Sequence, residues 1–410
     1  MIARAAPHCG ARLSQPQRAA SPCWVEPRTP SPFRQYGARH TAPHGPVPAL
    51  RPGQPRSAQR LSALGISGLS EAGVYAKLPR VLNPFLHWVE AGGIWAPWLF
   101  LALFLAASFL MLWRLEALSA AGFHGTLLGA LILPYCSGLG NIIFAFILGQ
   151  TGGSGADVMV NSYVNNLTNF TFVLGVPALI WGINLRKPAA KGKEPGAGNG
   201  NDRLDVLFTL TAALFFTAVI WVMGLKGRLD FRDGLILVGL FLFWQSFHVF
   251  EALKTHAEHG KLLHWLLPLD LLAIGAGAYG IYVSTGWLVN WVELRPAGFV
   301  SAAHLGWLSG WLMVLPNAVL AFYYGWRRQP EVVYASQVGD AHVSIPLCLG
   351  IYALYHPLVF SATTVPALQL LIGVIGFHLL SVAVLGSLPR LAGLALTAAY
   401  GYFIYTGWCK

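Results

Sequence analysis

The chain has 410 residues, of which 55% are hydrophobic and only 10% are charged. Soluble domains carry about 25% charged residues, so this composition excludes an ordinary soluble protein and predicts an integral membrane protein. The net charge of +11 is concentrated near the N-terminus, so it does not indicate nucleic acid binding.

The N-terminal segment differs in composition from the rest of the chain. Residues 1–76 hold nine arginines against two glutamates, and 11 of the 26 prolines. They contain no apolar run long enough to cross a membrane. Such a segment cannot bury enough apolar surface to offset its ordering entropy, so we expect residues 1–80 to be disordered. Two origins stay open, a targeting segment and a start codon assigned too early.

Ten apolar stretches follow, each close to the roughly 20 residues that a membrane-spanning helix needs. They divide into two halves of five, residues 95–250 and 264–410. Five spans per half place the two halves in the membrane with opposite orientations, which is typical of transporters built from inverted repeats. We therefore predict an all-α integral membrane protein with two inverted five-helix repeats and broken helices at the midplane. The predicted spans are 96–114, 123–149, 157–184, 205–224, 231–250, 264–286, 299–325, 331–355, 364–386 and 390–408.

The distribution of lysine and arginine predicts the orientation. Eleven of them lie in the loops after spans one, three, five, seven and nine, against seven on the opposite face. Loops rich in these residues stay in the cytoplasm. This places both termini outside the cytoplasm, whereas the arginine-rich N-terminal segment favours the opposite orientation. We expect the membrane to be a bacterial inner membrane.

A polar segment occurs twice within the apolar sequence. Polar groups at bilayer depth are costly and usually mark a pathway for something polar. Gly175 ends the first copy and Gly350 ends the second, 175 residues later. The first copy contains Ser137, Asn141, Asp157, Asn161, Asn165, Asn166 and Asn169, and the second contains Asn317, Glu331, Gln337, Asp340, His342 and Ser344.

The first copy is rich in neutral oxygen atoms. Pro134, Gly138 and Gly140 predict a break in span two, and Pro316 predicts a matching break in span seven. Backbone carbonyls freed by such breaks are hard oxygen ligands that suit Na⁺, K⁺ or Ca²⁺. Three asparagines of span three, spaced four residues apart, share one helix face. They could line an ion site or, alternatively, form hydrogen bonds between helices.

The second copy supplies the charge. Asp340 is the one carboxylate deep within either copy, because Asp157 and Glu331 lie at the starts of spans. A buried lone carboxylate either titrates or binds a cation. A structural pair with His342 is the alternative, but residues two apart on a helix point in different directions. His342 could relay protons or donate a hydrogen bond.

This pattern resembles the cation/calcium exchanger superfamily, which includes sodium/calcium and proton/calcium exchangers. Residues 137–141 and 315–317 resemble the first element of the family repeat, and residues 161–169 and 337–344 resemble the second. The resemblance covers about residues 95–410. It implies ten spans in two inverted halves, alternating access and a cation site at the midplane.

Several positions depart from the family pattern. Asn141 and Asn317 stand where the family has ion-binding glutamates. A calcium site with one charged ligand should be weak, so the charge count favours exchange of monovalent cations or protons. We predict a cation antiporter and no enzyme; the alternative is a non-transporting scaffold or sensor with the same fold. The candidate ion-binding residues are Ser137, Asn141, Asn161, Asn165, Asn166, Asn169, Asn317, Gln337, Asp340 and Ser344, with Asp340 as the charged metal ligand and His342 as a candidate proton relay.

The expected partners follow from the same prediction. They are the lipid bilayer and small inorganic cations, and we expect no nucleic acid partner. No cofactor is expected beyond the transported ions, which could be Na⁺, Ca²⁺, K⁺ or H⁺. The sequence does not predict the oligomeric state.

Overall fold

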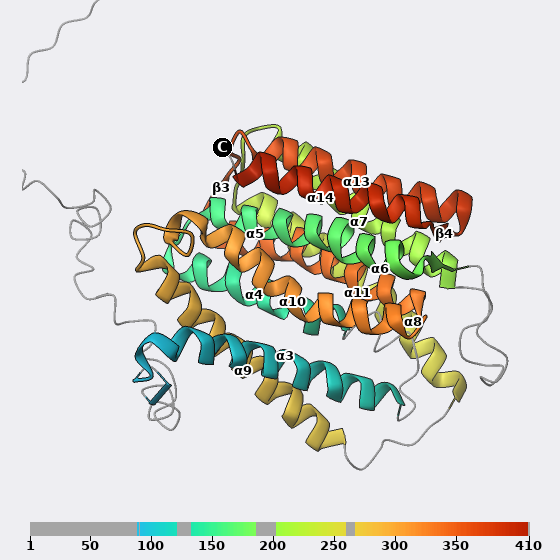
Figure 1. Ribbon diagram of the computed structural model, residues 1–410, viewed down its shortest axis with the longest axis horizontal. Coiled ribbons are helices and arrows are strands. Elements are labelled where there is room, and N and C mark those ends of the chain that lie inside the picture. Colours follow the sequence, from blue (N-terminus) through green and yellow to red (C-terminus); the bar gives the residue numbers. More distant parts are fainter. Residues whose placement is uncertain (1–87, 90, 121–132, 186–201, 260–266, 409–410) are drawn as a thin grey trace, which may run out of the picture. The chain divides into compact units, whose positions relative to one another are not determined.

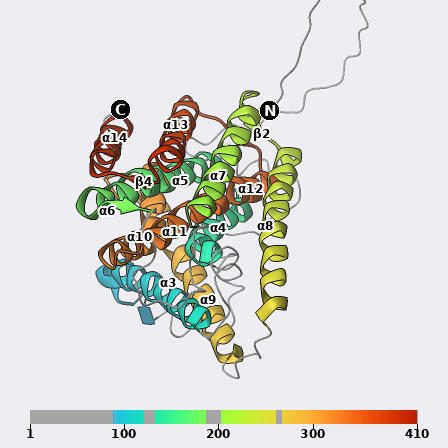
Figure 2. The same cartoon turned by 90° about the vertical axis from the view of Figure 1, so that its right-hand side faces the viewer.

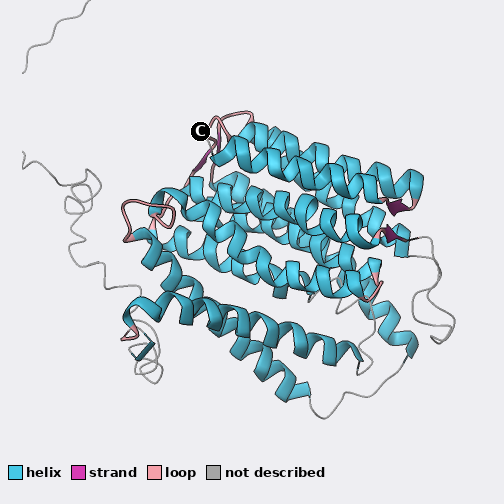
Figure 3. Cartoon of the chain, in the orientation of Figure 1, coloured by secondary structure: helices cyan, strands magenta, loops and turns pink. Residues whose placement is uncertain are grey.

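The structure is a computed structural model that describes residues 88–89, 91–120, 133–185, 202–259 and 267–408. The N-terminal segment 1–80, for which we predicted disorder, lies outside the described residues. The described part is almost entirely helical (Figure 3). Seven of its helical stretches are long and apolar enough to cross a membrane, so the chain is a multi-pass membrane protein.

Ten helical units in the described residues match the ten predicted spans (Figure 1). Two of them change from α-helix to π-helix and back. The others are single α-helices, and a short 3-10 helix, η3 (Gly93–Trp95), leads into the first. The units are α3 (Ala96–Ala120), α4 (Leu133–Thr151), α5–η5–α6 (Gly155–Thr168, Asn169–Val173, Leu174–Trp181), α7 (Asp202–Gly224), α8 (Phe231–His259), α9 (Leu267–Glu293), α10 (Leu305–Trp326, after the 3-10 turn Ala302–His304), α11–η7–α12 (Pro330–His342, Val343–Leu347, Cys348–Tyr355), α13 (Thr364–Leu385) and α14 (Arg390–Trp408).

The interruptions lie in spans three and eight, and not in the predicted spans two and seven. The helix α4 is continuous through Gly138 and Gly140, and α10 is continuous through Pro316. The π-turns η5 and η7 occupy equivalent positions of the two halves. A proline has no N–H and clashes with the carbonyl four residues before it. Pro346 lies within η7 and Pro177 follows η5 by four residues, so both widened turns lie where a regular α-helix would clash.

The helices pack in pairs that are related by the repeat (Figures 1 and 2). The first helices of the two halves, α3 and α9, pack together, and so do the fourth helices, α7 and α13. The second helix of each half packs on the third unit of the other half, α4 on α11 and α12, and α10 on α5. The fifth helix packs on the end of the third unit, α14 on α6 and α8 on α12. The third units therefore lie at the centre, and residues 161–170 and 336–350 are buried without exception.

Two short strand pairs repeat the same relation. Strand β1 (Ile183–Asn184), after unit three, pairs with β4 (Ser387–Leu388), between units nine and ten. Strand β2 (Arg228–Leu229), between units four and five, pairs with β3 (Leu358–Val359), after unit eight. Each pair joins two loops that ten alternating crossings place on the same face of the membrane. The ladders therefore support the predicted alternation of the spans.

The glycines that end the two polar copies allow helices to approach closely. A Cβ added to Gly175 would lie 3.1 Å from the carbonyl oxygen of Gly393 in α14. A Cβ added to Gly350 would lie 3.2 Å from the carbonyl oxygen of Gly234 in α8. Small residues at such crossings let backbones touch, which drives helix association in membranes. The repeat at positions 175 and 350 thus has a packing cause in both halves.

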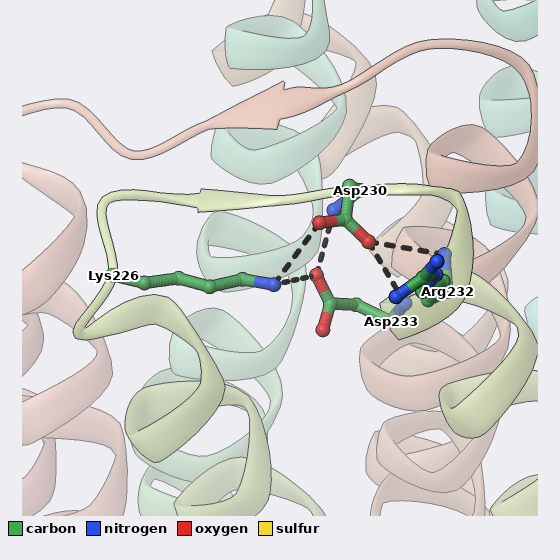
Figure 4. A network of polar contacts seen from close by, with 4 residues as sticks. All are labelled: Lys226, Asp230, Arg232 and Asp233. Carbon is green, nitrogen blue, oxygen red and sulfur yellow. Dashed lines mark hydrogen bonds and ion pairs between the residues drawn. The ribbon is translucent and has the colours of Figure 1, made fainter.

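The start of α8 is held by a reciprocal cap in the loop after α7 (Figure 4). The Asp230 carboxylate accepts hydrogen bonds from the backbone N–H groups of Arg232 (3.0 Å) and Asp233 (3.4 Å). The Asp233 carboxylate accepts one from the Asp230 N–H at 2.7 Å. Lys226 pairs with both carboxylates. Together these contacts satisfy two of the N–H donors that the first helical turn leaves free, those of Arg232 and Asp233.

We expect Asp230→Ala to lower the melting temperature in detergent by no more than about 3 °C. The substitution removes one helix cap, and the ion pair between Lys226 and Asp230 that it also removes is exposed and therefore weak. The hydrogen bond from Lys226 lowers the pKa of Asp230. This contribution is therefore present above the ordinary carboxyl pKa and is lost as the pH falls through the lowered value. Asp230→Asn keeps an accepting oxygen and should lose less. Melting curves of the three proteins across acidic pH test this, and equal curves would contradict it.

Candidate ion-binding site

The site is centred on Asp340, whose side chain is completely buried in α11. Its Oδ2 atom accepts hydrogen bonds from the Nδ2 groups of Asn165 at 2.6 Å and Asn169 at 2.9 Å. Asn165 belongs to α5 and Asn169 is the first residue of η5, one helical turn later. The charged group of the second half is therefore held by two neutral amides of the first half. Asn165 and Asp340 lie 175 residues apart, which is the spacing of the repeat itself.

The other carboxylate oxygen of Asp340 faces α4. Oδ1 has no hydrogen-bond partner among the described residues. A Cβ added to Gly138 would lie 3.1 Å from it, so any larger residue at this position would press on the carboxylate. Asn141, one turn further along α4, is completely buried and close enough to interact with the Asp340 carboxylate, although neither atom of its amide makes a hydrogen bond of ordinary geometry in the described part of the chain. The predicted role of Gly138 as a helix break is therefore wrong, and the glycine serves as a spacer beside the acid.

A second group of polar contacts joins the two halves near the carboxylate. Asn166 donates through Nδ2 to the Ser162 carbonyl at 2.7 Å and to Ser344 Oγ at 2.8 Å. Ser344 Oγ donates to the backbone carbonyl of Asp340 at 2.8 Å, and Ser162 Oγ donates to the Ser344 carbonyl at 2.9 Å. The hydroxyl protons of Ser162 and Ser344 are both donated to backbone carbonyls. The contacts between Ser162, Asn166 and Ser344 therefore tie α5 to η7.

The remaining candidates of the repeat lie at the contacts with α10. Asn161 donates to Ser309 Oγ at 3.0 Å, which is a hydrogen bond between helices of the kind given above as the alternative. Gln337 Nε2 donates to the backbone carbonyl of Asn317 at 3.1 Å and to Ser336 Oγ at 3.0 Å. The side-chain amide of Asn317 is completely buried, and both of its polar atoms are without a partner among the described residues.

Several side-chain oxygens of this region are buried and accept no hydrogen bond from the residues that the structure describes. An unpaired polar atom at membrane depth is costly, so these atoms are the candidates for binding a ligand that oxygen atoms hold. Neutral and singly charged oxygens are the ligands of hard cations. The atoms are Asn141 Oδ1, Asn165 Oδ1, Asn166 Oδ1, Asn169 Oδ1, Asn317 Oδ1, Gln337 Oε1 and Asp340 Oδ1.

His342 is directed away from these oxygens. Its Nε2 donates to the carbonyl of Thr209 in α7 at 2.8 Å. Its ring packs edge to face against Phe216 and Trp244, with centroids 6.0 Å and 5.3 Å apart and interplanar angles of 71° and 74°. The structure does not bring it to Asp340, and its role as a proton relay stays a prediction. The side chain of Ser137 lies outside the described residues.

Four further residues complete this region, and the sequence marked only one of them, His378, as a polar residue at membrane depth outside the repeat. Ser162 and Ser309 bind candidates on neighbouring helices, and Tyr334 and His378 bind each other near the π-turn of unit three. Ser162 lies inside the asparagine run, so its position was a usable signal. Tyr334 lies inside the second polar copy, whereas Ser309 and His378 lie outside the repeat. Among the described residues, no three histidine, cysteine, aspartate or glutamate side chains come together, so amide oxygens dominate the site.

Comparison with known proteins decides the fold family. A model of the sodium/calcium exchanger protein family matches residues 93–250, which are the first five units. The sodium-calcium exchanger NCX_Mj soaked with 100 mM Na⁺ and 10 mM Sr²⁺ superposes with a TM-score of 0.56 at 17% identity, over 76% of this chain and 96% of that chain. The chain has the sodium/calcium exchanger fold. The predicted resemblance to the cation/calcium exchanger superfamily is confirmed, and so is the predicted fold class of two inverted five-helix repeats.

Other structures of NCX_Mj agree with this exchanger fold. One soaked with 2.5 mM Na⁺ and 0.1 mM Ca²⁺ gives a TM-score of 0.55 at 17% identity, over 76% of this chain and 96% of that chain. One soaked with zero Na⁺ and Ca²⁺ gives a TM-score of 0.53 at 18% identity, over 76% of this chain and 97% of that chain. Among curated proteins, none matches the chain significantly. At this identity the likeness extends to the arrangement of helices and not to the ion.

Proposed function

We propose that the protein is a secondary active cation antiporter that binds its ion at the midplane of the membrane. The observation that carries this proposal is the completely buried Asp340 carboxylate, with one oxygen held by Asn165 and Asn169 and the other without a partner among the described residues. A buried carboxylate needs a partner of positive charge or a proton. A cation between Asp340 and the unpartnered amide oxygens would neutralise the acid and satisfy these oxygens together.

The arrangement of the two halves supports alternating access. Each half contributes ligands to one cluster, and each half packs its second helix on the third unit of the other. Inverted repeats of this kind have two arrangements of similar energy, which expose a central site to opposite faces. We propose that the cluster around Asp340 is the site that changes its exposure. The orientation with both termini outside the cytoplasm of a bacterium stays part of this proposal.

The charge of the site bears on the identity of the ion. Calcium exchange would follow from the fold family, since NCX_Mj is a sodium-calcium exchanger. In this chain Asn141 and Asn317 replace the two glutamates of the family pattern, and Asp340 is the acid of the cluster. Binding of Ca²⁺ at about 10⁻⁶ M or tighter takes several carboxylate ligands. We therefore propose a monovalent cation or a proton as the ion that moves, with Ca²⁺ bound weakly or not at all.

A flux measurement tests this proposal. Purified protein in proteoliposomes should take up ²²Na⁺ when an outward gradient of Na⁺ or of protons is imposed, and uptake of ⁴⁵Ca²⁺ should be much slower. A pH-sensitive dye inside the vesicles reports proton movement in the same preparation. Folded protein that moves none of Na⁺, K⁺, Ca²⁺ or H⁺ would contradict transport and favour the alternative, a scaffold or sensor that keeps the exchanger fold.

A further inference from the structure

His378 connects three helices beside the ion site. It lies in α13 and is completely buried. Its Nε2 donates to the backbone carbonyl of Phe170 at 2.7 Å, and its Nδ1 lies 3.0 Å from the hydroxyl of Tyr334. The ring packs against both aromatic rings, with centroids 5.7 Å apart in each case. Phe170 belongs to η5 and Tyr334 to α11, so one side chain of α13 joins the two elements that form the site.

The two hydrogen bonds orient the imidazole ring. A carbonyl oxygen can only accept, so the proton lies on Nε2. In the neutral ring Nδ1 is then an acceptor, and the Tyr334 hydroxyl donates to it. Tyr334 is completely buried as well. A ring held at both nitrogens inside a membrane helix bundle has little freedom, because breaking either bond leaves a buried polar group unpaired.

These bonds reach residues that adjoin the ligands. Phe170 directly follows Asn169, which donates to Asp340, and Tyr334 precedes Asp340 by six residues in the same helix. The carbonyl that His378 holds belongs to the π-turn, whose first residue is Asn169. The direction of the Asn169 side chain depends on the geometry of that turn. Because the hydrogen bonds of His378 go to Phe170 and Tyr334, any effect on the ion acts through them.

We propose that His378 is a positioning residue that holds the π-turn η5 against α11 and thereby aims the Asn169 amide at Asp340. In this role it sets the affinity of the site for its cation. The inference rests on the proposed transport function. Packing alone would require only that the volume of the ring be filled, whereas positioning requires a donor to the Phe170 carbonyl.

The test uses three substitutions at two positions. His378→Phe fills the volume without a donor, and His378→Gln can place an amide N–H near the same carbonyl. Tyr334→Phe removes the hydroxyl that holds Nδ1. We expect His378→Phe to raise the KM for ²²Na⁺ uptake at least tenfold, with a smaller change in kcat. His378→Gln should recover a large part of the affinity, and Tyr334→Phe should lie between His378→Phe and the wild type.

A matched control removes one buried hydrogen bond elsewhere. Thr217→Val deletes the hydroxyl that donates to the Ala213 carbonyl within α7, at 2.7 Å, and should leave KM unchanged. Stabilisation of each purified variant against heating by added NaCl, with choline chloride as the reference salt, reports binding without transport. A wild type that neither transports nor is stabilised by any cation overturns the proposed function. A wild type that transports, with His378→Phe altering only the melting temperature, overturns the positioning role alone.

Discussion

Replacing Asp340 with asparagine should reduce cation flux in proteoliposomes at least 100-fold while the protein still folds. The substitution keeps the shape of the side chain, and the new amide oxygen can accept the hydrogen bonds that Asn165 and Asn169 donate to Oδ2. It removes the negative charge. A unit charge about 4 Å from a cation is worth about 4 kcal/mol at an effective dielectric constant of about 20, which is about a thousandfold in affinity. Flux of radioactive cations measures the loss of transport, and size-exclusion profiles show whether the variant still folds.

Asp270→Asn is the matched control for this experiment. Asp270 is also buried in a membrane helix, but it lies at the start of α9, where it pairs with Arg114 of α3 at 3.3 Å. The same chemical change there should leave flux within a few-fold of the wild type, although it weakens one ion pair. Wild-type flux in the Asp340→Asn variant would show that the Asp340 carboxylate does not bind the transported cation. An equal loss in both variants would mean that charge anywhere in the bundle matters.

Gly138→Ala should lower the flux by about tenfold or more. A Cβ at this position would lie 2.8 Å from Val343 Cγ1 and 3.1 Å from Asp340 Oδ1. The methyl group would therefore press on the carboxylate oxygen that has no hydrogen-bond partner and push α4 away from η7. Forcing extra atoms into a packed interior costs about 1–3 kcal/mol. The measurement is the initial rate of cation uptake as a function of cation concentration, together with the melting temperature.

Gly373→Ala in α13 provides the comparison. Among the described residues, no atom lies within 4 Å of a Cβ built on Gly373, and the residue is helical. Alanine is favoured over glycine in a helix, so this variant should be as stable as the wild type or slightly more so, with unchanged uptake. If Gly138→Ala transports as fast as Gly373→Ala, the space between α4 and Asp340 is not where the cation binds.

Span positions could be predicted closely from the sequence. The predicted span 331–355 corresponds to the unit Pro330–Tyr355, and the predicted span 390–408 to α14. For span two, residues 123–132 of the predicted range lie outside the described residues, and the rest of that range lies within α4. The helix breaks were misplaced because glycine and proline allow either a break or a close approach, and the neighbouring helix decides between them. Gly138 and Gly140 face Val343 and Met313, which no local pattern indicates.

The candidate residues have different roles because they face different neighbouring helices. Asn161, Asn165 and Asn169 share one face of unit three, as their spacing predicted. Even so, Asn161 binds Ser309 of α10, whereas the other two bind Asp340. A periodic pattern determines which side chains point in one direction and does not say which helix lies there. His378 stands out in the sequence only as a polar residue at membrane depth outside the repeat, because its importance comes from a carbonyl of η5 and a hydroxyl of α11.

The sequence by itself determined that this is a membrane protein with two polar, repeated segments. Hydropathy and span length are local properties, and the thickness of the bilayer translates them directly into helices. Only the tertiary structure decided that Asp340 meets Asn165 and Asn169, 175 and 171 residues away. That contact depends on the crossing of two central units, the phase of each helix and the π-turn between them. These quantities arise from packing between segments distant in the chain.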